Sequence, residues 1–274
     1  MNPATIIGLV VALACCLGSV IVEGGHLGAL VNLPAAMIVF GGTFGAAMIS
    51  TRMDAVTRLP VVLRIAFASK TPEPLVVCRE MIAMAQVARR DGFLGLEQEI
   101  PRIAEANRFM GRALQMVADG TSPETVEEVL YTELEQLSAR HGKGASLLEQ
   151  MGGLAPTLGV TGTVMGLVHM MGKLDDPSTM GPAIAGAFLA TLYGVASANL
   201  IFLPLAGKLK MLSKVEQAAC AIVIEGTRAI QRGDNPILVA ELLTSFLPPS
   251  ERAKIDGTGA GGSGGGDVEQ AQAA

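Results

Sequence analysis

Four long runs of apolar residues dominate the pattern along the chain. Each has at least 18 residues and no Asp, Glu, Lys or Arg, and together they cover residues 4–22, 33–50, 153–171 and 181–207. A helix needs about 20 mostly apolar residues to cross a bilayer. The pattern therefore predicts four membrane-spanning helices, and the fourth is long enough to tilt or to project from the membrane.

The second run is the shortest, but residue types mark both of its ends. Asn32, Leu33 and Pro34 precede it as a start signal, and Arg52 follows it as a stop. Proline is tolerated in the first turn of a helix, whereas an arginine is costly inside the bilayer. We therefore expect a complete span here.

The polar segment between the second and third spans carries helix signals of its own. A helix is expected to begin at Pro72-Glu73-Pro74, and Gly92 is expected to end it. Ser122 is a candidate N-cap, because Pro123 follows it at the first helical position. These signals predict a large helical region, and the fold class is that of an all-α membrane protein.

The end of the chain divides into helices and a glycine-rich tail. Residues 215–231 are expected to continue as a helix, and a short helix is expected from Asp234-Asn235-Pro236 to Pro248-Pro249. Residues 257–266 are almost all Gly, Ser, Thr and Ala, so they cannot build a packed core. The expected segments are spans one and two in 1–51, a helical domain in 52–150, spans three and four in 151–210, C-terminal helices in 211–254 and a disordered tail in 255–274.

The composition agrees with membrane segments and excludes several kinds of site. Charged residues make up 16% of the chain, against about 25% in ordinary soluble domains. The net charge of -5 argues against a nucleic-acid-binding surface, which is normally basic. The four cysteines lack the spacing of metal ligands and are expected to be small buried hydrophobic residues.

Basic residues predict how the spans are oriented. Of the 20 Lys and Arg residues, 19 lie between the second and third spans or after the fourth. Loops rich in Lys and Arg stay in the cytoplasm. Both termini and the helical region are therefore expected to be cytoplasmic.

The spans lack a central charged carrier, and His169 lies near the end of the third run, where an interfacial residue is expected. No Asp, Glu, Lys or Arg lies within any of the four apolar runs. A protein that moves protons or sodium ions through a membrane needs an ionisable group at depth. A partner must therefore supply the carboxylate if this chain conducts ions. The sequence also shows no nucleophile–base pair, metal-ligand cluster or phosphate loop, so we predict no enzymatic activity and no cofactor.

Small residues line the third and fourth runs. Gly162 and Gly166 are four residues apart, and a stripe of Ala and Gly follows the next run through Ala187, Ala190 and Gly194. Such residues let helices approach closely. They are interpreted either as packing within the subunit or as a smooth wall against a neighbouring chain.

Two threonines and two prolines stand out in these runs. The hydroxyls of Thr163 and Thr191 either bond to their own helix backbone or lend oxygens to a passing cation. Pro156 lies near the start of its span, whereas Pro204 lies deep in a long helix, where it should force a kink. Both prolines shape their helices, and a kink can also act as a hinge.

Opposite charges are concentrated in residues 89–99 of the helical region. Arg89, Arg90, Glu97 and Glu99 all belong to this segment. The segment is either a solvated surface or a docking surface for a cytoplasmic partner.

Several of these motifs are similar to those of one family. Residues 156–171, 190–210 and 234–249, with Phe40-Gly41-Gly42-Thr43 in the second run, resemble the MotA/PomA flagellar stator proteins. The resemblance implies a pentamer in the bacterial inner membrane around two copies of a single-span MotB/PomB partner, whose Asp carries the ion. It also implies torque on the rotor protein FliG.

The resemblance also implies roles for individual residues. Arg89 and Glu97 match the rotor-binding charges of the family, and Arg90 and Glu99 match additional charges of PomA-like members.

In the membrane, Pro156 and Pro204 match prolines implicated in coupling, and Thr191 matches an ion-path threonine. Thr163 matches sodium-type members, so Na+ is favoured over H+ as the translocated ion. Asn32 departs from the Asp found there in some PomA-like proteins.

Three other classes of protein share part of this pattern, and each differs from the stator family in one feature. ExbB/TolQ proton-channel subunits energise outer-membrane transport and resemble the last two spans, but they have one span before the cytoplasmic region. A channel or transporter acting alone would conduct ions without a partner. A soluble helical scaffold would have to bury all four apolar runs.

Overall fold

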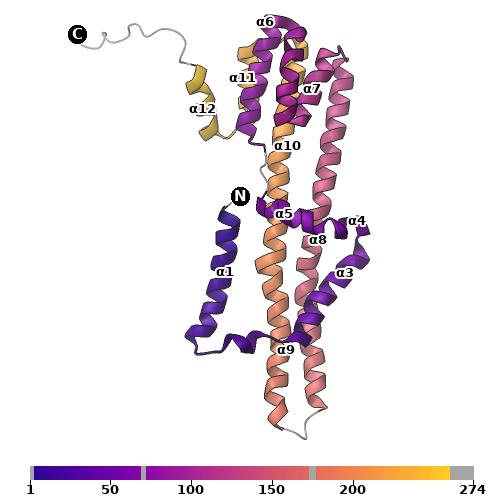
Figure 1. Cartoon of the computed structure of the whole chain (residues 1–274), viewed down its shortest axis with the longest axis vertical. Coiled ribbons are helices and arrows are strands. Elements are labelled where there is room, and N and C mark those ends of the chain that lie inside the picture. Colours follow the sequence, from indigo (N-terminus) through magenta and orange to yellow (C-terminus); the bar gives the residue numbers. More distant parts are fainter. Residues whose placement is uncertain (1–2, 69–71, 173–176, 260–274) are drawn as a thin grey trace, which may run out of the picture. The chain divides into compact units, whose positions relative to one another are not determined.

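The computed structural model describes residues 3–68, 72–172 and 177–259, and every regular element in these ranges is helical. The chain forms two compact units. The first comprises residues 1–71 and 136–214, and the second comprises residues 72–135 and 215–274. Figure 1 shows the helices of both units, coloured by their position in the sequence. The all-α class and the four candidate membrane helices are confirmed.

The first unit holds the apolar spans. Its elements are α1 (Pro3–Val22), η1 (Leu27–Leu30), α2 (Leu33–Ala36), η2 (Met37–Gly41), α3 (Gly42–Ser50), α4 (Met53–Thr57), α5 (Leu59–Ala68), α9 (Pro177–Ser197), η3 (Ala198–Phe202) and parts of α8 (Pro123–Met171) and α10 (Leu203–Arg232). None of the described side chains of α1 is buried, and Ile7, Val10 and Ile21 are all more than half exposed. Such an apolar surface is suited to contact with lipid.

The start of the second span follows the sequence signal. The Asn32 side chain caps α2, because its Oδ1 accepts a hydrogen bond from the Ala35 N–H at 3.0 Å. Pro34 lies in the first turn, where its missing N–H costs nothing. The helix then widens into a π-helical turn, η2, before it continues as α3.

The fourth span also contains a π-helical turn. It is η3, which ends directly before Leu203 and Pro204. Proline lacks the N–H of an ordinary helical residue, and its ring clashes with the preceding turn. The wider turn gives the chain room for Pro204 while the helix continues into α10, so the disturbance expected at this proline takes the form of a π-bulge.

The second unit is a small helical domain with its own core. Its elements are α6 (Pro74–Ala106), α7 (Arg108–Ala118), α11 (Pro236–Thr244), α12 (Pro249–Gly259) and the remaining parts of α8 and α10. Met81, Leu114, Leu130, Ile222 and Leu243 are all fully buried in it. The helices therefore pack around one apolar centre, as an independent domain requires.

Local signals set the ends of these helices. Gly92 interrupts α6 with a φ of 70° and a ψ of -168°, as its position after the arginines predicts. Ser122 Oγ accepts from the Thr125 N–H at 3.3 Å at the start of α8. Asn235 caps α11 by accepting from the Ile237 N–H at 3.0 Å. α12 extends to Gly259, inside the segment expected to be disordered, and the rest of that segment lies outside the described residues.

The cysteines divide between the two units. Cys78 and Cys220 are buried, as expected of small hydrophobic residues, but Cys15 and Cys16 are exposed on α1. The expectation was wrong for these two because an apolar run that faces lipid buries nothing against protein. Burial raises the pKa of the Cys78 thiol to about 11.

Candidate functional site

The first candidate site is a pair of threonines between two membrane helices. Thr163 on α8 and Thr191 on α9 place their hydroxyl oxygens 2.5 Å apart. Thr163 Oγ1 also lies 2.9 Å from the Ala187 carbonyl oxygen and 3.1 Å from that of Gly159. The structure therefore brings the two residues together and satisfies their hydroxyls at the same time.

Small residues allow α8 and α9 to come this close. A Cβ atom added at Gly159 would lie 2.8 Å from the Ala190 carbonyl oxygen, and one added at Gly194 would lie 2.5 Å from the Ala155 carbonyl oxygen. Added Cβ atoms at Gly162 and Gly166 would be equally crowded by the side chains of α9. Of the two interpretations of these small residues, packing within one subunit is the one that the structure supports at these positions.

The two prolines lie beside another close approach. Gly152 on α8 lies four residues before Pro156, and Leu203 directly precedes Pro204. A Cβ added at Gly152 would lie 2.6 Å from Cδ2 of Leu203. Each proline thus lies close to the contact between α8 and α10. Because the two helices are tightly packed there, a change in the shape of one would displace the other.

The charged segment of α6 flanks the break at Gly92. Arg89 and Arg90 precede the break, Glu97 and Glu99 follow it, and only Glu99 is partly buried. Arg89 Nη1 donates to the Gly233 carbonyl oxygen at 3.3 Å, so its charge has a neutral partner. Among the described residues, Glu97 makes no ion pair.

Arg90 and Glu99 each form an ion pair with a neighbouring residue of α6. Arg90 binds the Asp91 carboxylate with both its Nε and its Nη2, at 3.0 and 2.8 Å. These hydrogen bonds hold the pKa of Asp91 below its usual range and raise the pKa of Arg90. Glu99 Oε2 accepts from Arg102 Nε at 2.9 Å. No ion pair in the described part of the chain joins Arg89 or Arg90 to Glu97 or Glu99.

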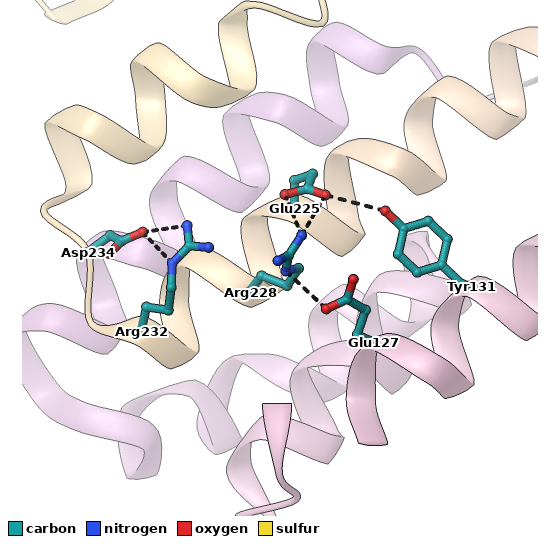
Figure 2. A network of polar contacts seen from close by, with 6 residues as sticks. All are labelled: Glu127, Tyr131, Glu225, Arg228, Arg232 and Asp234. Atoms are coloured by element: carbon teal, nitrogen blue, oxygen red, sulfur yellow. Dashed lines mark hydrogen bonds and ion pairs between the residues drawn. The ribbon is translucent and has the colours of Figure 1, made fainter. Parts of the chain in front are cut away.

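Sequence reasoning missed a polar network in the second unit, which Figure 2 shows. Arg228 Nε lies 3.2 Å from the Glu127 carboxylate, and its Nη1 lies 3.2 Å from Glu225. The Tyr131 hydroxyl donates to Glu225 at 3.4 Å. Partial burial, followed by the charge of Glu225, raises the pKa of Tyr131.

The network ties α8 to α10 at positions distant in the sequence. The spacing of Glu225 and Arg228 is typical of a helical ion pair and could have been noticed. The ion pair between Arg228 and Glu127 could not have been predicted, because no local sequence signal indicates which helix packs against α10. The pair of Arg232 and Asp234 at 2.7 Å closes the turn that follows α10.

Comparison with known proteins identifies the family. Residues 102–221 match the MotA/TolQ/ExbB proton channel family, and residues 6–91 match the N-terminal model of motility protein A. A motility protein A of Borreliella burgdorferi is 35% identical over 93% of this chain and 98% of its own length. The chain belongs to the MotA/PomA family of flagellar stator proteins.

Other members of the family agree with this result. The chemotaxis protein PomA of Vibrio alginolyticus is 32% identical over 92% of this chain and 98% of its own. The solved structure of C. jejuni MotAB matches with a TM-score of 0.85 and 31% identity, covering 91% of this chain and 97% of that one. The flagellar MotAB stator complex of Bacillus subtilis matches with a TM-score of 0.81 and 33% identity, covering 92% and 98%.

Family membership excludes two of the alternatives. The motility protein A match over residues 6–91 includes two spans before the charged region, whereas ExbB/TolQ subunits are expected to have one. A soluble scaffold is excluded, because MotA/PomA proteins are multi-pass proteins of the inner membrane. The family consists of ion-channel subunits of the stator and not of enzymes.

Proposed function

We propose that this chain forms a stator with a single-span MotB/PomB-type subunit, in a ratio of five copies to two. In this complex the partner's carboxylate would carry Na+ past the chain, and ion passage would drive torque on FliG. The observation that carries the proposal is the absence of any Asp, Glu, Lys or Arg from four apolar runs in a channel-family protein. The titles of both matched solved structures name MotAB, which supports a partner of this type.

The threonine pair supports sodium as the ion. The Thr163 hydroxyl oxygen has three oxygen neighbours within 3.1 Å. They are the Thr191 hydroxyl oxygen and the carbonyl oxygens of Gly159 and Ala187. Hard cations prefer such neutral and anionic oxygen ligands, whereas a proton needs only a titratable group. A carboxylate brought beside Thr163 and Thr191 would complete a site for a partly dehydrated Na+.

Swimming speed tests the choice of ion. The experiment places this chain and its partner in a cell as the only stator and varies the Na+ concentration at fixed pH and constant ionic strength. We expect speed to rise with Na+ and to saturate. A speed that is independent of Na+ concentration but varies with external pH would instead assign proton transport. The matched family model is named for a proton channel.

The rotor surface is assigned to Arg89, Arg90, Glu97 and Glu99. Arg89 and Glu97 support this assignment best, because their side chains are exposed and no ion pair within the described residues neutralises them. Charged groups on an exposed surface steer a partner and fix its register. A rotor protein with the opposite pattern of charges would bind here.

We propose an orientation in which both termini and the second unit lie in the cytoplasm, because the Lys and Arg residues are concentrated in these segments. A single cysteine introduced between residues 23 and 32, in a background without the native cysteines, tests it. We expect a membrane-impermeant maleimide to label this cysteine from the periplasm of intact cells. Labelling only from the cytoplasmic side would reject the orientation.

A further inference from the structure

An open groove of about 680 Å³ lies in the first unit between α1, α5 and the segment formed by η3 and α10. Its walls are almost entirely apolar. Leu9 and Leu13 come from α1, Phe67 comes from α5, and Leu200 and Ile201 come from η3. Such a surface needs an apolar occupant or lipid.

One end of the groove carries a positive charge. Lys208 is the only charged residue of the lining and is partly buried. Within the described part of the chain no carboxylate pairs with Lys208, whereas Lys210, two residues later, lies 2.5 Å from Glu149. A partly buried ammonium group without an acidic partner favours a negative ligand.

The charge lies where the fourth span leaves the membrane. Residues 179–207 contain no charged side chain, so Lys208 is the first charge after the apolar run. Asn199, which also lines the groove, precedes Lys208 by nine residues, or about 13 Å of helix. The groove therefore runs from the polar boundary into the apolar layer, as the headgroup and chain of a lipid do.

The polar end of the groove favours a lipid over another apolar helix. The apolar walls suit an acyl chain, and a phosphate would pair with Lys208. An apolar helix in the groove would leave that ammonium group without a negative partner. We propose that the groove binds one anionic phospholipid, with the phosphate on Lys208 and an acyl chain between α1 and α10.

This inference uses the proposed orientation only to name the leaflet, which would be the cytoplasmic one. Binding itself does not depend on the ion, on torque or on the rotor. A binding assay in symmetric bilayers can therefore fail or succeed independently of the proposed stator function.

Two pairs of variants test the site. Gly8 lines the groove, and a Cβ added there meets no atom within 4 Å, so Gly8→Phe introduces a bulky side chain into the lining from an uncrowded backbone position. Gly18→Phe is the matched control, because the added Cβ is equally free but lies outside the groove. Lys208→Gln removes the charge, and Lys214→Gln removes an exposed charge from the same helix.

The experiment uses the full chain with its partner subunit in nanodiscs. The probe is phosphatidylglycerol with a photoreactive acyl chain, and labelled peptides of α1 and α10 are quantified by mass spectrometry. We expect labelling to fall about fivefold with Lys208→Gln, as the loss of one interfacial charge implies, and to disappear with Gly8→Phe. Both control variants should label like the parent.

Three results would overturn the inference. The first is equal labelling by phosphatidylcholine carrying the same photoreactive chain. The second is labelling that Lys208→Gln and Gly8→Phe leave unchanged. The third is a photoreactive residue at position 12, which lines the groove, that cross-links to a second copy of the chain instead of to lipid.

Discussion

At the scale of single residues, the hydroxyl of Thr163 has three oxygen neighbours. It bonds to Thr191 and lies within 3.1 Å of two carbonyl oxygens on two helices. Neither interpretation of this threonine excludes the other, since a hydroxyl already ordered by backbone carbonyls can still offer a lone pair to a cation.

Thr163→Ala should raise the Na+ concentration needed for half-maximal swimming speed by about fivefold, because one hydrogen-bonding oxygen is worth about 1 kcal/mol. Thr161→Ala is the control, because its hydroxyl is exposed and bonds only within its own helix, to Thr157. Speed against Na+ concentration at fixed pH provides the measurement. An unchanged midpoint in Thr163→Ala would remove this threonine from the ion path.

Tyr193 has a structural role at the start of the second span. Its hydroxyl donates to the Leu30 carbonyl oxygen and accepts from the Asn32 N–H, the latter at 2.9 Å. Its ring stacks on Phe40 with a centroid distance of 6.1 Å. The Asn32 side chain also caps α2, a role that Asp fills equally well, so the cap itself does not require an uncharged residue there.

Tyr193→Phe should lower the thermal stability of the detergent-solubilised protein. It removes two hydrogen bonds that hold the 27–32 segment to α9, each worth about 1 kcal/mol. Tyr131→Phe is the comparison, because its 3.4 Å bond to Glu225 is exposed and its loss should matter less. A melting temperature equal to that of the parent would contradict the role of Tyr193.

At the scale of elements, the contact between α8 and α9 depends on glycine. Gly194→Ala should destabilise the protein by about 1–3 kcal/mol, because the new Cβ would lie 2.5 Å from the backbone oxygen of Ala155. The helices would have to separate, and the threonine pair with them. We expect a smaller yield of assembled complex and a lower melting temperature on fluorescence-detected size exclusion.

Gly181→Ala gives the opposite control on the same helix. A Cβ there meets no atom within 4 Å, and alanine is favoured over glycine in a helix by about 0.5–1 kcal/mol. This variant should be as stable as the parent or slightly more so. If both variants behaved alike, helix propensity rather than close approach would decide the role of these glycines.

The charged part of α6 makes a different prediction, because its residues are exposed. Arg89→Glu should impair swimming while membrane insertion and complex assembly stay normal, since the side chain has only the Gly233 carbonyl as partner. Arg108→Glu changes an exposed arginine of the same unit and should swim normally. Normal motility after reversal of both Arg89 and Glu97 would argue against rotor binding here.

At the scale of the whole molecule, the chain divides into two units that match the two proposed tasks. The first unit holds the apolar spans and the threonine pair, and the second holds the charged surface and its own apolar core. α8 and α10 each contribute to both units. Two continuous helices are thus shared by the part that would meet the ion and the part that would meet the rotor.

The absence of Asp and Glu from the four apolar runs leads to a prediction for the chain without its partner. The purified protein in liposomes, without its partner, should give no Na+ or H+ flux above that of empty liposomes, because no charged carrier lies within its spans. Co-reconstitution with the partner is the positive control. Robust flux from the chain alone would overturn the argument that another polypeptide brings the acid.

The sequence by itself determined the features that depend on neighbours along the chain. The four apolar runs, the cap at Asn32, the break at Gly92 and the start at Pro123 all follow from hydrophobic length or from backbone preferences. Such signals act over a few residues, so they can be recognised without knowledge of the fold.

Only the tertiary structure decided which distant residues meet. Thr163 and Thr191, whose hydroxyls meet, are 28 positions apart in sequence. Asn32, whose backbone N–H donates to the Tyr193 hydroxyl, is 161 positions from that tyrosine. The bond between Arg228 and Glu127 and the groove around Lys208 also depend on which helix surfaces face each other. That choice is made by the fit of side chains across helices, which periodicity along one helix does not specify.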